Sequence, residues 1–143
     1  MSPPKKVVLD ANILIRAVLG KKVYGLLRAF EDKVEFYIPD FCVEEAQRNL
    51  VRIAEEKKIS AADLIAFLAQ IVDEFLLLVD HSLYDEFDGQ ACARFSDRDV
   101  DDWPVVAIAL LLNAPIWTED RDFFGTGIAT WTTDRIEIYL RDV

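Results

Sequence analysis

Residues 7–15 read VVLDANILI, and this stretch decides the fold. Its first three residues are apolar and favour extended structure, which predicts a short strand buried on both faces. Helical spacing begins directly after Asp10, because the apolar residues that follow can share one helix face. The strand therefore ends in a carboxylate at the start of a helix. Since open α/β sheets bind ligands at the carboxyl ends of their parallel strands, Asp10 is a candidate ligand.

The rest of the chain alternates between strand and helix patterns. Runs of β-branched and aromatic residues predict strands at 5–10, 34–38, 75–79, 116–118 and 128–132. Helical spacing predicts helices at 11–19, 23–32, 41–57, 61–73, 83–95, 100–113 and 133–142, with Asp40, Ser60 and Ser82 as caps. The last of these helices also fits strand spacing. The alternation predicts a single domain over residues 1–143, an α/β fold with three layers (α/β/α) and a mostly parallel sheet.

The charge balance argues against one class of protein. The chain has 26 acidic and 16 basic residues, a formal charge of -10, whereas proteins that coat nucleic acids are usually basic. Any contact with a polyanion is therefore expected to be local and to depend on bound cations or on a partner. No apolar run reaches the roughly 18 residues that span a bilayer. Cys42 and Cys92 make no disulfide framework, so a reduced, cytoplasmic globular protein without membrane contact is the expectation.

Acidic residues stand at four places where a strand ends or a buried helix begins. They are Asp10, Glu44 with Glu45, Asp99 with Asp101 and Asp102, and Asp120 with Asp122. Any one of them alone is more often a helix cap or a turn residue than a functional group. Gathered at one sheet edge, however, these carboxylates stay ionised together only if a cation neutralises them. Oxygen ligands without cysteine or histidine favour Mg²⁺ or Mn²⁺ over Zn²⁺.

Four segments carry a resemblance to a known family. They read VLDANIL at 8–14, PDFCVEE at 39–45, DWPVVAIAL at 102–110 and IWTEDRDF at 116–123. In this order and spacing, which spans nearly the whole chain, they resemble the PIN-domain family. Its members are Mg²⁺- or Mn²⁺-dependent ribonucleases and include the VapC-like toxins of prokaryotic toxin–antitoxin pairs. The resemblance implies a parallel five-strand sheet between helices, and hydrolysis of RNA phosphodiester bonds.

The resemblance also implies a set of site residues. The four family acids, which hold the metal and carry catalysis, match Asp10, Glu45, Asp102 and Asp120, and three auxiliary positions match Asn12, Thr118 and Asp122. Glu45 is chosen because it stands five residues before Leu50, and Glu44 is the second choice. The chain departs from the common pattern at Glu119, where the family often has asparagine.

The expected partners are an RNA substrate, an antitoxin protein and a second copy of the chain. The helices at 41–57 and 61–73 carry more apolar residues than one inward face requires. We therefore expect them to form a homodimer contact or a groove for an antitoxin segment. The best candidates for contacts with phosphates are Arg16, Lys21, Lys22, Arg28, Arg48 and Arg52, although a solvated face is the commoner use of each.

Other interpretations fit less well or stay open. A phosphatase of the haloacid dehalogenase type would need an aspartate two residues after Asp10, where the chain has Asn12. A receiver domain would need a lysine after the fifth strand, and none follows residues 131–133. A PIN-like scaffold that has lost activity and binds proteins is the alternative function. The only histidine, His81, is expected to be a capped surface residue rather than a base.

Overall fold

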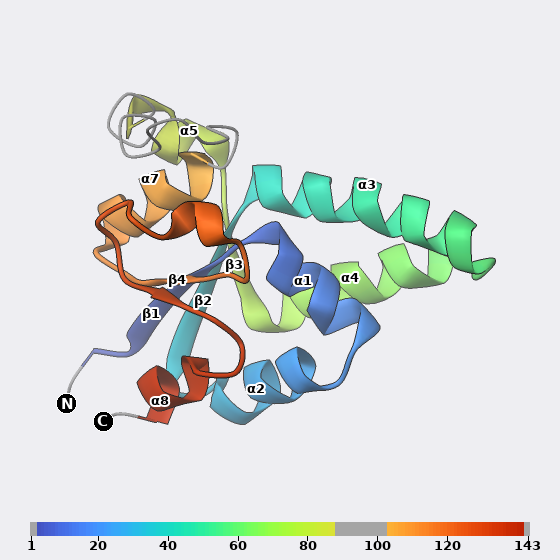
Figure 1. Cartoon of the computed structure of the whole chain (residues 1–143), viewed down its shortest axis with the longest axis horizontal. Coiled ribbons are helices and arrows are strands. Elements are labelled where there is room, and N and C mark those ends of the chain that lie inside the picture. The colour runs from blue at the N-terminus through green and yellow to red at the C-terminus, as the bar shows by residue number, and fades with distance from the viewer. Residues whose placement is uncertain (1–2, 88–102, 142–143) are drawn as a thin grey trace.

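Five parallel strands form one sheet in the computed structural model, which describes residues 3–87 and 103–141 (Figure 1). The strands are β1 (Lys5–Leu9), β2 (Val34–Pro39), β3 (Leu76–Val79), β4 (Ile116–Trp117) and β5 (Thr130–Trp131). Their order is β3-β2-β1-β4-β5, and every neighbouring pair is parallel. The expected α/β architecture is confirmed, and β1 lies in the middle of the sheet. All five strands consequently end at the same edge.

Helices cover both faces of this sheet. They are α1 (Ala11–Leu19), α2 (Lys22–Phe30), α3 (Asp40–Lys57), α4 (Ala61–Phe75), α5 (His81–Tyr84), α7 (Trp103–Leu112) and α8 (Ile136–Arg141). Two short 3₁₀ turns, η1 (Asp85–Phe87) and η3 (Arg121–Phe123), follow α5 and β4. Helix α1 packs against α2, α3 and α4 on one side, while α7 packs on β1, β2 and β4 (Figure 1). In the described ranges, no helix is long and apolar enough to cross a membrane.

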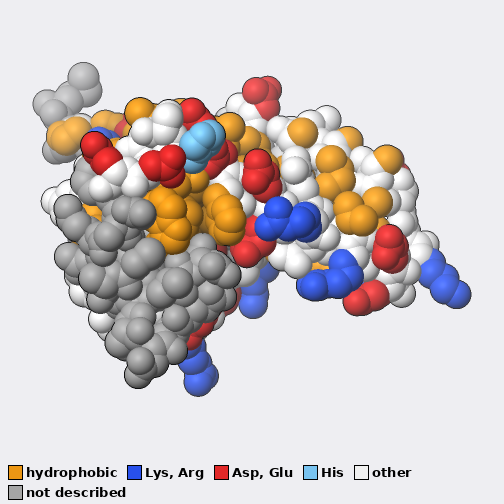
Figure 2. Space-filling view, turned by 90° about the horizontal axis from the view of Figure 1, so that it is seen from above, with side chains coloured by type: hydrophobic (Ala, Val, Ile, Leu, Met, Phe, Trp, Pro, Cys, Tyr) orange, Lys and Arg blue, Asp and Glu red, His pale blue; other side chains and the backbone are white. Residues whose placement is uncertain are grey.

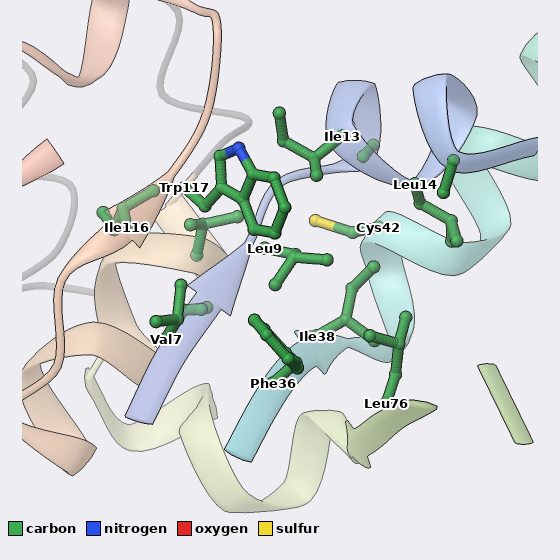
Figure 3. Close-up of a cluster of buried hydrophobic side chains, with 14 of the residues drawn as sticks. Val7, Leu9, Ile13, Leu14, Phe36, Ile38, Cys42, Leu76, Ile116 and Trp117 are labelled. Atoms are coloured by element: carbon green, nitrogen blue, oxygen red, sulfur yellow. The ribbon is translucent and has the colours of Figure 1, made fainter. Parts of the chain in front are cut away.

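The packing of the core explains why the second half of β1 is entirely apolar. Val7, Val8 and Leu9 are fully buried, because helices cover both faces of the central strand. Figure 3 shows side chains from β1, α1, β2 and β4 packed together, with the indole of Trp117 above Leu9. Helix α7 is buried along Pro104–Ala109, as expected for a helix that is apolar all round. Burial of these groups is the main force that holds the sheet edge in place.

Two predicted boundaries were wrong at the end of α4 and at α5. Helix α4 continues to Phe75, since the amide of Leu76 still bonds to the carbonyl of Val72, and β3 therefore begins one residue later. The helix predicted at 83–95 begins earlier, at His81, after Asp80 rather than after Ser82. The hydroxyl of Ser82 donates back to Asp80 instead of capping the helix. The rest of that predicted helix lies outside the described residues.

The C-terminal elements are shorter than predicted. Strand β5 spans only Thr130–Trp131, after a turn in which Gly125 and Gly127 have positive φ angles of 89° and 84°. The final segment is confirmed as helical, but α8 begins at Ile136 instead of residue 133. Ser60 caps α4 as predicted, accepting a hydrogen bond from the amide of Asp63. The start of the helix predicted at 100–113, with Asp99, Asp101 and Asp102, lies outside the described residues.

Candidate active site

Asp10 occupies the end of the central strand and caps α1. Its side chain is buried, with an exposed fraction of 3%. Oδ1 accepts a hydrogen bond of 2.7 Å from the amide of Ala11, which belongs to the first turn of the helix. Oδ2 accepts from the hydroxyl of Thr118 at 2.9 Å and from the amide group of Asn12 at 2.8 Å. Three donors therefore fix the orientation of one buried carboxylate.

The end of β4 supplies the second half of the site. Because β1 and β4 pair in parallel, Thr118 emerges beside Asp10. The Thr118 hydroxyl oxygen accepts a bond of 2.9 Å from the amide of Asp120, and Asn12 Oδ1 accepts one of 3.2 Å from the amide of Glu119. Asp120 Oδ1 in turn accepts from the amide of Asp122 at 2.9 Å. This network ties the loop after β4 to the start of α1.

Asp10 differs from an ordinary aspartate in the pKa of its carboxyl group. Burial raises the pKa of its carboxyl to about 6; hydrogen bonds from Thr118 and Ala11 oppose the shift, and the charges of Glu45 and Asp120 add to it. Glu45, half-buried near the start of α3, and Asp120 therefore act on Asp10 as neighbouring negative charges. A divalent cation bound beside an ionised Asp10 would neutralise the negative charges of these carboxylates. The oxygen-only donor set fits Mg²⁺ or Mn²⁺.

The structure brings most of the predicted site residues together. Asp10, Asn12, Thr118 and Asp120 share one hydrogen-bond network, and Asp122 is attached to it through its backbone. Glu44 is exposed, whereas Glu45 is half-buried and acts on Asp10. Asp102 lies outside the described residues. The role of each of these residues in binding metal stays a prediction.

A second polar cluster forms where β2 and β3 end. His81 Nδ1 lies 3.0 Å from Asp40 Oδ2 and 3.0 Å from Asp80 Oδ1, and the hydroxyl of Tyr84 donates to Asp40 Oδ1. Figure 2 shows acidic side chains next to the histidine. Although desolvation acts against it, hydrogen bonds from Tyr84 and His81 hold the pKa of Asp40 at about 2. The bond to Asp40 and the charge of Asp80 raise the pKa of His81.

This cluster was not predicted from the sequence. Asp40 was expected to cap a helix beginning at residue 41, but α3 begins at Asp40 itself and Pro39 holds the cap position. His81 was expected to be a capped surface residue, and its amide does bond to Asp40 Oδ2, at 3.0 Å. The sequence shows that each residue follows a strand, but it does not show that the two strands are neighbours. Each acid here already faces a group that becomes cationic, unlike Asp10. Within the described ranges, Asp40, Asp80 and His81 form the only group of three or more acid and histidine side chains whose ligand atoms all lie within 4.8 Å of one another without a bound ion.

Glu119 has a defined place at the edge of the network. One carboxylate oxygen accepts a bond of 2.6 Å from the amide of Thr133, which follows β5. The hydroxyl of Thr133 accepts from the indole of Trp117 at 3.1 Å. The departure from the family pattern at this position therefore puts a carboxylate between the ends of β4 and β5, where it links the two strand ends.

The fold is shared with several solved structures. PAE2754 from Pyrobaculum aerophilum gives a TM-score of 0.75 at 16% identity, over 95% of each chain. VapBC2 from Rickettsia felis, bound to a DNA fragment from its promoter, gives 0.68 at 16% identity, over 89% of this chain and 98% of that chain. FitAcB from Neisseria gonorrhoeae gives 0.55 at 16% identity, over 89% and 97%. At these identities the likeness establishes the fold.

Sequence comparison gives the family directly. No curated protein sequence matches the chain. The family model of the PIN domain, however, matches residues 8–141, which include the end of β1, the Asp10 network and every later described element of the fold. This match and the five-strand parallel sheet agree with the resemblance carried by the four sequence segments. The chain belongs to the PIN domain family.

Proposed function

We propose that this protein is a metal-dependent endoribonuclease that hydrolyses RNA phosphodiester bonds and acts as the toxin of a toxin–antitoxin pair. The observation that carries the proposal is the buried Asp10, whose pKa is raised to about 6 beside Glu45 and Asp120. Such a strongly perturbed carboxyl at the carboxyl edge of a parallel sheet is typical of a functional site. Nuclease chemistry is the activity of the PIN domain family, to which the chain belongs.

The residues have distinct tasks in this proposal. Asp10, Glu45 and Asp120, with Asp102 from the sequence, would hold Mg²⁺ or Mn²⁺. The bound ion would make a water molecule more acidic and neutralise charge on the phosphate. Thr118 and Asn12 fix the carboxylate of Asp10, so its oxygens need not reorient when substrate arrives.

The expected products are a 5′-phosphate and a 3′-hydroxyl. A ribonuclease mechanism with two histidines is excluded, because the chain contains one histidine. That histidine is engaged with Asp40 and Asp80 at the ends of other strands.

The toxin assignment is supported by solved structures that share the fold of this chain. VapBC2 and FitAcB are related in fold, and a further match at a TM-score of 0.62 is described as a toxin–antitoxin complex from Klebsiella pneumoniae. We infer an antitoxin partner and a homodimer for this chain as well. The competing function is a catalytically inactive scaffold that binds proteins, in which the same acids only cap helices.

A cleavage assay separates these two functions. Purified protein is incubated with a mixed-sequence fluorogenic RNA in Mg²⁺, in Mn²⁺ and in EDTA, beside Asp10→Asn. Asp73→Asn is the matched control, since Asp73 is an exposed acid of α4. We expect metal-dependent cleavage by wild type and the control, and a rate at least about 100-fold lower for Asp10→Asn, because even residues behind metal ligands typically account for 10- to 100-fold. Equal cleavage by Asp10→Asn, or cleavage that survives EDTA, would contradict the proposal.

A further inference from the structure

We propose that a pocket beside the acid network binds one nucleotide of a single-stranded RNA, next to the bond that is cut. This inference deepens the proposed function and rests on it. The pocket has a volume of about 510 Å³ and opens between the start of α2 and the loops that follow β4 and β5. The residues that matter for its chemistry are Arg16, Lys22, Glu119, Phe124, Thr133 and Asp134.

The pocket adjoins the acid network through Glu119. Glu119 lines it, and the backbone of Glu119 lies between Thr118 and Asp120 and donates to Asn12 Oδ1. Arg16, a second lining residue, follows Asn12 by one turn along α1. A chain of nucleotides that passes the carboxylate of Asp10 would therefore enter this pocket with its next unit.

The cationic side of the pocket suits a backbone phosphate. Arg16, Lys22 and Arg121 line it, although the chain as a whole carries a formal charge of -10. A second hollow of about 300 Å³ shares Arg16 and Lys22 and adds Lys21. Within the described part of the chain, neither Arg16 nor Lys22 forms a direct side-chain ion pair. The first turn of α2 also contains no acid and lacks a side-chain cap, which leaves its positive end facing this region.

The acidic lining residues disfavour a second phosphate and favour a base or sugar. The carboxylates of Glu119 and Asp134 would repel an anion, but they accept hydrogen bonds from ribose hydroxyls and base amino groups. Glu119 is held in place by the amide of Thr133. Phe124 lines the pocket and is 43% exposed, so part of its ring offers a surface for stacking.

These features together favour an unpaired nucleotide over an acidic peptide. A base can stack on Phe124 only if it is not paired in a duplex, and an acidic peptide would place carboxylates against Glu119 and Asp134. Phosphate on Arg16 and Lys22, with the base on Phe124, suits both the cationic and the acidic lining residues.

Binding is measured separately from cleavage. All proteins carry Asp10→Asn, which keeps the RNA intact, and fluorescence anisotropy follows a fluorescein-labelled, unstructured 12-nucleotide RNA over a series of salt concentrations. Adding Arg16→Gln and Lys22→Gln should raise Kd at least tenfold and reduce the slope of log Kd against log salt by about 1.4, since each phosphate contact on a single strand contributes about 0.7. Adding Phe124→Leu should raise Kd about fivefold or more.

Lys33→Gln is the matched control, because Lys33 is an exposed cation just before β2, at the opposite end of the strands from the acid network, and lines neither hollow. It should leave Kd and the salt slope unchanged. Thermal melts of each variant test that the fold is intact. A further arm replaces the RNA with a labelled poly-glutamate peptide, and another with the same RNA annealed to its complement; both should bind more weakly than the single strand.

The binding and cleavage results together test the pocket assignment separately from the catalytic proposal. Equal RNA binding by the Arg16/Lys22 double variant and the Lys33 control, or no RNA binding by the parent protein, would overturn the pocket assignment. Tighter binding of the peptide than of RNA, abolished by the double variant, would also overturn it and identify an acidic segment as the occupant. If the binding shifts occur while wild type cleaves no RNA, the pocket stands and the catalytic proposal alone fails.

Discussion

Two acid clusters lie at the same edge of one sheet, yet their electrostatics are opposite. Asp10, at the end of β1, is buried among like charges, and its pKa is raised to about 6. Asp40, at the start of α3, is bonded by Tyr84 and His81, and its pKa is lowered to about 2. In the described part of the chain, the groups that donate hydrogen bonds to Asp10 are neutral, whereas Asp40 is bonded to His81. Position at the sheet edge therefore does not determine the pKa of a carboxylate; burial and the hydrogen-bonded partners do.

The largest contrast is expected in metal binding. Asp10→Asn should weaken Mn²⁺ binding by at least about tenfold, because it removes the carboxylate charge at the centre of the network. Asp40→Asn should leave the affinity unchanged within about twofold. Isothermal titration calorimetry of both variants and wild type gives the three affinities. Equal losses in both variants would show that the two clusters do not differ in the way we describe, and equal affinity for Asp10→Asn and wild type would remove Asp10 from the site.

The second contrast concerns stability and pH in metal-free protein. Because the folded pKa of Asp10 is about 6 and its ordinary value is 3.8, ionisation destabilises the fold as pH rises through this window, by about 3 kcal/mol in total. Asp10→Asn lacks this loss. Urea denaturation of both proteins in EDTA should therefore show the variant gaining about 3 kcal/mol relative to wild type between pH 4 and pH 8. A difference that stays constant with pH would mean that burial does not perturb Asp10.

The third contrast is smaller and has the opposite sign. The folded pKa of Asp40 is lowered, so its contribution to stability is present above about pH 4 and is lost as pH falls toward 2. Asp40→Asn should be less stable than wild type at pH 7 by about 1.5 kcal/mol, the lower end of the range typical of hydrogen bonds to a charged group. The difference should shrink on acidification. Denaturation curves at pH 7, 4 and 2.5 test this, and a gap that widens toward low pH would contradict the assignment.

Much of the fold could be predicted because its signals are local. The sequence of residues 7–15 contains both the strand and the start of α1, and burial of Val7–Leu9 on both faces follows from their uninterrupted apolar character. Ser60 could be identified as a cap from the pattern around it. The end of α4 could not, since Phe75 is apolar and fits a strand as well as a helix.

The site shows the same division. Asp10 and Asn12 are two residues apart and could be paired from the sequence, and the family pattern placed Thr118 and Asp120 beside them. The bond between the Glu119 side chain and the amide of Thr133 joins the ends of β4 and β5. No pattern in the sequence indicates this bond. The meeting of His81 and Asp40, 41 residues apart, depends on the order of the strands in the sheet. Contacts of this kind follow from topology, and single-sequence patterns do not contain them.

The hydrogen-bond network around Asp10 can form only after residues far along the chain have been synthesised. Asp10 is made early, but Thr118, which donates to it, is 108 residues later, and β4 depends on pairing with β5 at Thr130–Trp131. A chain still being translated at residue 117 has Asp10 and Glu45 but lacks the hydroxyl and the loop that complete the network. Under the proposed function, the centre is complete only after Thr118 and the loop that follows β4 have been synthesised. Growing fragments that end before Thr118 would therefore lack activity.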